Sequence, residues 1–333
     1  MINLQDDVNK RDNLYRVYFD VGTSKSRGFL LKGLRVLDQM KKKIGSKDVA
    51  IEDDQKLLKR EIKKLYRNIK ADNSLKDKDI EEIYLSGMVT SKFGFKEVPH
   101  IPTPVTIEKL AESIYSYEDE IFGRDINLIR GLKTFSDDRE INAENFSEIN
   151  NVRGEEIEIF GIVSRCSKNK FHVFMPGSHT HIARIENGEI KDLLSSFTGE
   201  LFQVISEHTL LSPSIDLSCE KYDVEMLKKG FQHSEELGMN RSLYLINTMQ
   251  MFTDIDKNKK TSYLEGIILG DLIRLFRRRW PDAQDVMVAA KPALGFAYEK
   301  LLENYDYNIV EFNCESELSV EGFKMILNYL WQR

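Results

Sequence analysis

The sequence is poor in the residues that disulfide frameworks, zinc sites and membrane spans require. Its 333 residues include only three cysteines, which are odd in number and scattered at Cys166, Cys219 and Cys314. This pattern excludes a disulfide framework and is typical of a reducing compartment. No apolar run approaches the roughly 20 residues of a membrane-spanning helix, and residues 1–13 lack the apolar core of a signal peptide. We therefore expect a cytoplasmic protein with no membrane partner, in which residues 1–13 form a loose extension.

A strong charge of one sign is also missing, which limits the possible partners. The chain has 48 lysine and arginine residues against 54 aspartate and glutamate residues, a net charge of −6. An acidic chain is a poor general ligand for nucleic acid, so we expect no nucleic-acid partner. The composition is ordinary for a globular protein, and 333 residues exceed what one hydrophobic core usually carries. We predict two domains.

The first half of the chain contains a strand that ends in one acid and then turns through small residues. The apolar run 15–19 stops at Asp20 and resumes at 28–31, and between them lie Gly22, Thr23, Ser24 and Lys25. Backbone N–H groups and hydroxyls in such a turn can face phosphate oxygens. An aspartate at the end of the strand can hold a hydrated Mg²⁺. The same pattern also occurs in plain hairpins, so this motif alone does not assign a function.

The second half repeats this order of elements. An apolar segment over 171–175 leads to a second small turn, and an alternating strand follows; the turn consists of Gly177, Ser178, His179 and Thr180. Asn187-Gly188 then predicts a tight hairpin into a third strand, at the place that Lys32-Gly33 occupies in the first half. Two such turns that face each other across a cleft would suit ATP, and two unrelated hairpins are the alternative.

Hydrophobic periodicity in the rest of the chain alternates between helix and strand, which indicates the α/β class. In the first half the pattern predicts helices over 48–70, 107–121 and 154–163, and strands over 80–85 and 125–130. In the second half it predicts helices from 198 and over 264–275, 292–304 and 316–330, and strands over 286–290 and 307–312. We expect the N-terminal domain to span 1–167 and the C-terminal domain 168–333.

Six motifs occur in a fixed order along the chain: Asp20–Arg27; Ser86–Ser91 with Glu97–Pro99 and Pro102–Pro104; Val152–Glu156 with Phe160-Gly161; Met175–Thr180; Phe197–Phe202; and Ser262–Gly270. In this order they resemble those of the 2-dehydro-3-deoxygalactonokinase family, within the actin-like ATPase and sugar kinase superfamily. The resemblance implies two similar domains of the actin-like ATPase (ribonuclease H-like) type flanking an ATP cleft, the second phosphate turn and the nucleotide-binding region lying in 168–333. The chain departs from the family pattern at Val21, Lys25, Thr90, Phe95 and His181.

The activity that the resemblance implies is phosphoryl transfer in carbohydrate metabolism. Such a transferase uses ATP and Mg²⁺ to phosphorylate the terminal hydroxyl of a sugar acid. The substrate implied is 2-dehydro-3-deoxy-D-galactonate, which would become its 6-phosphate. A kinase for another sugar or sugar acid on the same fold, and a non-catalytic ATP-binding sensor, are the alternatives. The oligomeric state does not follow from the sequence.

The resemblance also assigns roles to single residues. It implies that Asp20 holds Mg²⁺ through water and that the turns 22–25 and 177–180 bracket the phosphates. The acceptor hydroxyl needs a carboxylate that takes its proton. In this superfamily that acid begins the helix that closes the first half, which points to Glu155, with Glu156 as the alternative. Both could instead be ordinary first-turn acids that stabilise the helix dipole.

A sugar acid also needs a local cation, because the protein as a whole is acidic. Arg27, Lys92 and Arg153 lie in or beside the motifs, and arginine can grip a carboxylate with two parallel hydrogen bonds. Arg27 could equally be a structural bridge between strands. We expect the remaining substrate contacts to come from the backbone around the segment Ser86, Gly87 and Met88.

Overall fold

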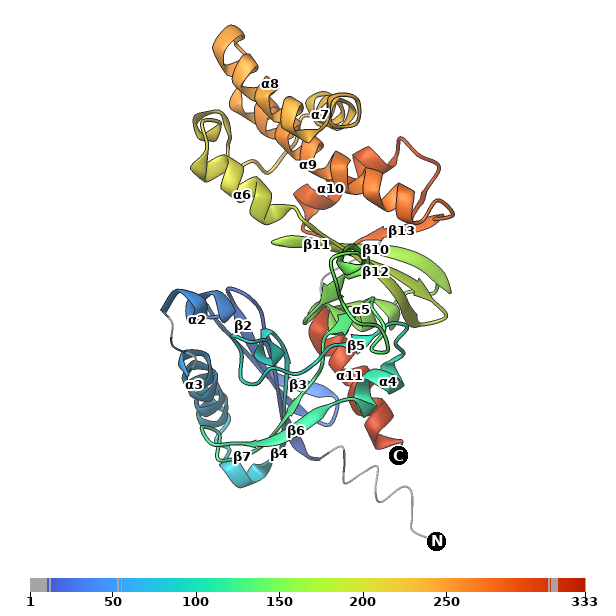
Figure 1. The fold of residues 1–333 in the computed structure, drawn as a ribbon. Coiled ribbons are helices and arrows are strands. Elements are labelled where there is room, and N and C mark those ends of the chain that lie inside the picture. Colours follow the sequence, from blue (N-terminus) through green and yellow to red (C-terminus); the bar gives the residue numbers. More distant parts are fainter. Residues whose placement is uncertain are drawn as a thin grey trace. The chain divides into compact units, whose positions relative to one another are not determined.

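The chain folds into two compact units in this computed structural model, which describes residues 11, 13–52, 54, 56–310, 312 and 317–332 (Figure 1). The first unit comprises residues 1–167, 188–191 and 316–333, and the second comprises 168–187 and 192–315. The extension predicted over 1–13 lies almost entirely outside the described residues. No helix among the described residues combines the length and the apolar character that a membrane span requires.

The first unit is built on a six-stranded sheet with the strand order β3-β2-β1-β4-β7-β6. Its first three strands form an antiparallel meander, β4 and β7 continue the sheet in parallel, and β6 closes one edge antiparallel to β7. The strands are β1 (Tyr15–Val21), β2 (Ser26–Lys32), β3 (Arg35–Lys42), β4 (Ile80–Gly87), β6 (Tyr115–Asp119) and β7 (Arg124–Leu128). Because β1 lies in the middle of the sheet, its side chains are buried on both faces, as its apolar sequence requires.

Helices cover this sheet, and a small second sheet lies beside it in the same unit. The amphipathic helix α3 buries one apolar face, formed by residues such as Leu58, Ile62 and Ile69. The helices are α2 (Ser46–Glu52), α3 (Leu57–Asp72), α4 (Ile107–Glu112), α5 (Glu155–Val163) and α11 (Leu318–Trp331). The small sheet contains β5 (Ile101–Pro102), β8 (Leu132–Lys133) and β9 (Asn151–Val152), and the 3₁₀ turns are η1 (Asp77–Asp79), η2 (Met88–Thr90) and η3 (Phe146–Glu148).

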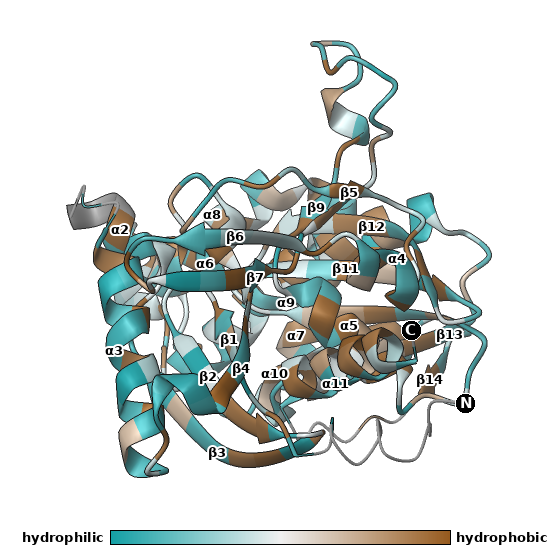
Figure 2. Ribbon diagram, turned by 90° about the horizontal axis from the view of Figure 1, so that it is seen from below, coloured by the Kyte–Doolittle hydropathy of each residue, from teal (hydrophilic) through white to brown (hydrophobic). Residues whose placement is uncertain are grey.

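The last helix of the chain, α11, packs directly on α5 (Figure 1). Two glycines allow this close approach: a Cβ atom on Gly161 would collide with the carbonyl oxygen of Leu318, and one on Gly322 would collide with that of Ile157. Figure 2 shows α5 as largely hydrophobic, in agreement with the burial of most of its residues. The C-terminal helix therefore fixes the position of α5, whose first turn carries the predicted base.

We expect Gly322→Ala to destabilise the first unit by about 1–3 kcal/mol, because overpacking would push α11 away from α5. The measurement is the midpoint of thermal unfolding followed by circular dichroism. Gly295→Ala is the matched control: it also lies in a helix, but its nearest neighbour would be in ordinary contact at 3.9 Å. That variant should be neutral or slightly stabilising, because alanine favours helix over glycine. An unchanged midpoint for Gly322→Ala would contradict tight α5–α11 packing.

The second unit has a five-stranded sheet with the order β12-β11-β10-β13-β14. Its strands are β10 (Lys170–Pro176), β11 (His179–Glu186), β12 (Glu189–Phe197), β13 (Asp285–Val288) and β14 (Asn308–Val310), and the first three residues of β12 are grouped with the first unit. β10 pairs antiparallel with β11 and parallel with β13, as β1 does with β2 and β4. Its helices are α6 (Gly199–His208), α7 (Val224–Leu237), α8 (Met239–Phe252), α9 (Lys257–Arg279) and α10 (Pro292–Leu302), with the 3₁₀ turn η4 (Ser212–Ser214).

The predicted fold class is confirmed: both units are α/β, and each places its first strand between an antiparallel second strand and a parallel fourth strand. The predicted hairpin at Asn187-Gly188 is also present, and both residues have the positive φ angles of such a turn, 53° and 77°. This repeat is the arrangement expected of the actin-like ATPase type.

Two helices expected from the sequence differ in the structure. The helix predicted over 48–70 is divided into α2, which ends at Glu52, and α3, which begins at Leu57. The helix predicted over 107–121 ends at Glu112, and Tyr115–Asp119 forms the edge strand β6 instead. Pairing with β7 decides this, because Tyr115, Tyr117 and Asp119 also alternate at the period of a strand. The compact units divide the chain after residue 167, and helix α11, which was expected in the C-terminal domain, is grouped with the first unit. The domain boundaries themselves stay a prediction.

Candidate active site in the first unit

The site is built where two parallel strands end beside the start of a helix. β1 and β4 are in register, so Asp20 lies opposite Ser86 and Val21 opposite Gly87. Gly87 has a φ of 81°, and a Cβ atom there would collide with the carbonyl oxygen of Val21. Gly154, with a φ of 116°, approaches so closely that its Cβ would lie 3.2 Å from the Cα of Gly87. The two glycines thereby bring the first turn of α5 to the end of β1.

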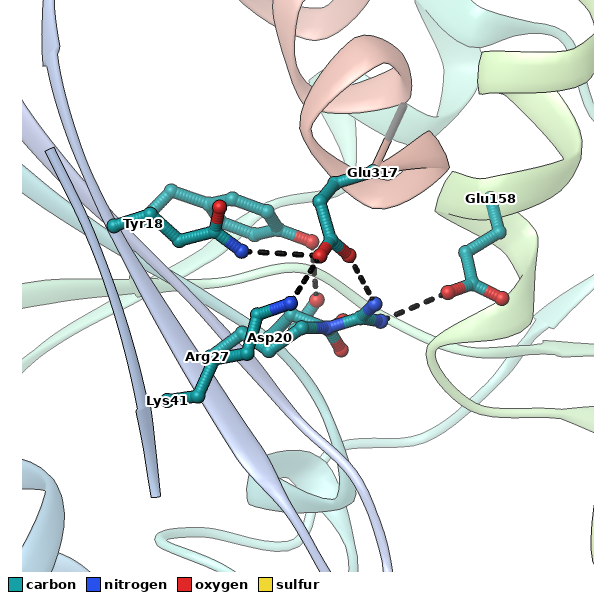
Figure 3. A network of polar contacts seen from close by, with 8 residues as sticks. Tyr18, Asp20, Arg27, Lys41, Glu158 and Glu317 are labelled. Carbon is teal, nitrogen blue, oxygen red and sulfur yellow. Dashed lines mark hydrogen bonds and ion pairs between the residues drawn. The ribbon is translucent and has the colours of Figure 1, made fainter. Parts of the chain in front are cut away.

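Arg27 on β2 organises the charged groups at this point (Figure 3). Its Nε donates to Oδ2 of Asp20 at 2.8 Å, and its Nη2 also donates to that oxygen. The same Nη2 donates to Glu158 at 2.9 Å, and Nη1 donates to Glu317 at 2.5 Å. One guanidinium therefore joins carboxylates from β1, from α5 and from the residue that precedes α11. The contact with Asp20 links β2 to β1, as the bridging role requires, and substrate binding by Arg27 stays a prediction.

Burial dominates the electrostatics of this cluster. It raises the pKa of Asp20, and the ion pair with Arg27 opposes that rise. Burial also raises the pKa of Glu158 to about 7, with a further rise from the Asp20 charge and an opposing effect from Arg27. Holding these carboxylates close together in a buried place costs free energy, and the Arg27 guanidinium offsets part of that cost. Perturbed carboxyl groups grouped in this way are typical of functional sites.

The two candidate bases begin α5 and differ in their surroundings. Oε2 of Glu155 accepts a hydrogen bond from the backbone N–H of Arg153 at 3.0 Å, and Glu155 is close enough to raise the pKa of Asp20. Oε2 of Glu156 accepts from the N–H of Gly154 at 2.6 Å, while its Oε1 is buried without a hydrogen-bond partner. Burial, and then the Glu155 charge, raise the pKa of Glu156 to about 8. A carboxyl with a pKa of about 8 is mostly protonated near neutral pH, so Glu156 is the poorer candidate for a base there.

The first predicted phosphate turn is exposed and firmly held. Thr23, Ser24 and Lys25 are exposed, and the N–H of Gly22 donates to the carbonyl of Lys25 at 2.9 Å. The start of α2 holds the turn in place. The backbone N–H of Ser46 donates to the carbonyl of Gly22, and that of Lys47 donates to the carbonyl of Thr23. The turn thus keeps its hydroxyls and its lysine available to a ligand.

The second predicted turn, in the other unit, is only partly available. Gly177 and Ser178 are exposed, and His179 lies 3.3 Å from a carboxylate oxygen of Glu200. Thr180 is fully buried, and its hydroxyl contacts those of Thr198 at 2.8 Å and Tyr298 at 3.0 Å. The Thr180 side chain thus anchors the turn to the interior of its unit. That the two turns bracket one ATP stays a prediction.

The residues predicted to bind the sugar acid serve different purposes. Ser86 is buried, and its hydroxyl contacts that of Tyr18 at 2.7 Å. Arg153 braces the segment after β4: its Nη1 donates to the hydroxyl and, at 2.5 Å, the carbonyl of Thr90, and its Nη2 lies 3.2 Å from Nδ1 of His100. Lys92 is exposed, and in the part of the chain that the structure describes it forms no ion pair.

The carboxylate oxygens of this site suit a hydrated magnesium ion better than a metal ion held by protein side chains alone. Among the described residues, no cluster of three or more His, Cys, Asp or Glu side chains could hold a metal ion. Mg²⁺, however, keeps most of its water and commonly takes only one or two carboxylates together with phosphate oxygens. Both hydrogen bonds from Arg27 to Asp20 go to Oδ2, so Oδ1 is the carboxylate oxygen that would accept a hydrated ion. The residues therefore fit Mg²⁺ that arrives with a nucleotide.

Sequence reasoning missed two members of the site, Glu158 and Glu317. Glu158 could have been found, because it lies one helical turn after Glu155 and faces the same side of α5. Glu317 carries no local signal: it is 290 residues from Arg27, and only the return of the C-terminal segment to the first unit brings the two together.

Comparisons with known proteins agree with this architecture. The family model for 2-keto-3-deoxy-galactonokinase matches residues 20–326. The 2-dehydro-3-deoxygalactonokinase of Escherichia coli (strain K12) is 21% identical over 226 residues, which cover 66% of this chain and 70% of that protein. A probable 2-dehydro-3-deoxygalactonokinase of Rhizobium meliloti (strain 1021) is 29% identical over 133 residues, 40% of each chain. A crystal structure of a putative 2-dehydro-3-deoxygalactonokinase protein from Sinorhizobium meliloti superposes with a TM-score of 0.74 at 20% identity, covering 94% of this chain and 97% of that one.

Proposed function

Because the chain belongs to the 2-keto-3-deoxy-galactonokinase family, we propose that it transfers the γ-phosphoryl group of ATP to the terminal hydroxyl of a sugar acid. The first candidate substrate is 2-dehydro-3-deoxy-D-galactonate, and the product would be its 6-phosphate. The observation that carries this proposal is the meeting of Asp20 with the acidic start of α5 beside an exposed turn of small residues.

The chemistry requires alignment and charge neutralisation more than covalent help. Magnesium supplies charge neutralisation on the phosphates when it is bound with ATP. Asp20 would hold that ion through water, and Gly22, Thr23 and Ser24 would present N–H groups and hydroxyls to phosphate oxygens. Lys25 would place a further cation near the transferred group. Gly177, Ser178 and His179 would contact the phosphates from the second unit, with Thr180 holding that turn in place.

Glu155 would orient the sugar hydroxyl and take its proton. The oxygen then forms a bond to the γ-phosphorus, and the bond from that phosphorus to the bridging oxygen breaks, so that ADP leaves with the electron pair. Glu155 suits this role because it lies in the first turn of α5, at the positive end of the helix dipole. Glu156 is the alternative base. Arg27 and Glu317 act through Asp20 and are positioning residues.

Lys92 would meet the substrate carboxylate, since it is exposed and Arg27 and Arg153 are engaged by the protein itself. An exposed charge pair contributes up to about 1 kcal/mol, which is a roughly fivefold change in KM. We expect Lys92→Ala to raise KM for the sugar acid by about that factor and to leave KM for ATP unchanged. Lys78→Ala, an exposed lysine in η1, is the matched control and should change neither constant.

The activity is tested by measuring ADP release with matched pairs of sugar acids and neutral sugars. The proposal predicts turnover of 2-dehydro-3-deoxy-galactonate and a higher kcat/KM for each acid than for its neutral counterpart. The engagement of Arg27 and Arg153 favours a neutral-sugar kinase as the second candidate, and equal kcat/KM values within a pair would support that reading. If ATP binds but no sugar in the set stimulates ADP release, the sensor alternative gains the support instead.

A further inference from the structure

Helix α8 of the second unit is apolar on two opposite faces. One face packs inward: Ser242 and Ile246 are fully buried, and Leu243 and Met249 pack against the same core. The other face leaves Tyr244, Met251 and Phe252 exposed by 59%, 65% and 80%. A helix that is apolar all round is normally covered all round. Neighbouring exposed apolar side chains of this size are typical of an interaction surface.

Four exposed residues and one half-buried residue lie along one side of the helix. Arg241, Tyr244, Met251 and Phe252 are exposed, Thr248 is half-buried, and their spacings of three, four and seven residues place all five on the same side of α8. We call these five residues the α8 face. The 3₁₀ turn η4 packs beside this helix, and the hydroxyl of Ser214 in η4 donates to Oε1 of Gln250 at 2.6 Å.

The charges at the two ends of the α8 face are complementary to each other. Arg241 lies near the start of α8, with its guanidinium 5.5 Å from the centre of its own Tyr244 ring. Asp254 follows the end of the helix and is exposed. Within the described ranges of the chain, neither Arg241 nor Asp254 has an ion-pair partner. A surface with a cation at one end, an anion at the other and apolar residues between them matches its own copy when that copy is turned end to end.

We propose that the α8 face is an interface with a second copy of this chain. Two α8 helices pack antiparallel about a two-fold axis that passes near Thr248. Tyr244 of one copy then lies opposite Phe252 of the other, because the two residues are equally far from Thr248 along the helix. Arg241, seven residues before Thr248, comes near the partner's Asp254, which is six residues after Thr248 and just beyond the helix end. The contact occurs twice because such an interface is self-complementary. The antiparallel arrangement also sets opposite ends of the two helix dipoles beside each other.

The first test measures the mass of the protein in solution by analytical ultracentrifugation over about 1–100 µM. The wild-type chain should show the mass of two copies, and Met251→Ser combined with Phe252→Ser should show that of one. Phe146→Ser is the matched control, since Phe146 is also a strongly exposed aromatic residue, at 63%, but belongs to the first unit. It should leave the dimer intact. A wild-type monomer at every concentration, or a dimer that survives the double substitution, would overturn the proposal.

The second test uses the charges, which also identify the orientation. Arg241→Asp and Asp254→Arg should each weaken the dimer about tenfold or more, because each places like charges together twice. The combination of both changes should restore it. Thr248→Cys, treated with copper-phenanthroline as oxidant, should give a disulfide-linked dimer that the wild-type chain does not form. Failure of the double reversal to restore association rules out the antiparallel pairing. If the serine variant instead changes only KM for substrates, the face is covered by its own chain and the proposal is wrong.

Discussion

We expect Asp20→Asn to lower turnover by about 10²–10³ while the melting temperature changes by only a few degrees. The expected loss is large because the variant keeps the shape of the side chain but removes the charge that would hold hydrated Mg²⁺. The fold should tolerate the change, since Arg27 retains Glu158 and Glu317 as partners. Burial raises the pKa of Asp20, which means that the folded protein disfavours the charged form of this side chain. Replacing the carboxylate with a neutral amide therefore removes a buried charge. Initial rates at varied Mg²⁺ and ATP, with melting curves, provide the measurement.

Asp119→Asn gives the opposite pattern and serves as the control. Asp119 is as deeply buried, with 1% exposed, but lies at the end of β6. Its carboxylate accepts hydrogen bonds from Lys59 at 2.7 Å and from two backbone N–H groups at 3.0 Å. We expect this variant to melt earlier and to keep its specific activity. If Asp20→Asn also melted early and kept its specific activity, Asp20 would be a structural residue and the proposed metal role would be wrong.

Glu155→Gln should lower kcat by about 10²–10⁴ through the loss of proton transfer and alignment. The amide keeps an oxygen that can accept the N–H of Arg153, so the start of α5 should remain in place. Affinity for ATP, measured by calorimetry without sugar, should be preserved, because the turn 22–25 is unchanged. Single-turnover measurements would separate this loss of chemistry from any change in product release.

Glu156→Gln is the comparison that identifies the base. Burial raises the pKa of Glu156 to about 8, so near pH 7 this carboxyl is mostly protonated, and an uncharged amide resembles it. We therefore expect a small effect. If Glu156 were the base, its protonated form would be inactive and kcat would rise with pH through about 8 in the wild type, and Glu156→Gln would abolish that rise. If Glu155→Gln left kcat unchanged and Glu156→Gln lowered it strongly, the base would be Glu156. If neither substitution changed kcat, the mechanism would be refuted.

Much of the fold is readable from the sequence because the signals are local. The run that ends at Asp20, and the turn 177–180 after a second apolar run, both predict strands that the structure contains. Asn187-Gly188 specifies its hairpin through two residues that tolerate positive φ. The acidic start of α5 is likewise visible, because Gly154 and the first-turn acids are adjacent in the chain. The order of elements in each half then follows from alternating periodicity.

The sequence by itself therefore determined the α/β class, the repeated strand–turn–strand order and the position of Asp20 at a strand end. Only the tertiary structure decided that 115–119 is a strand, because its pairing with β7 overrides a spacing that also fits a helix. Only the tertiary structure turned Arg27 into a bridge between Asp20, Glu158 and Glu317. The physical reason is that local propensity is set by neighbouring residues, whereas these contacts depend on close helix packing that returns α11 to the first unit.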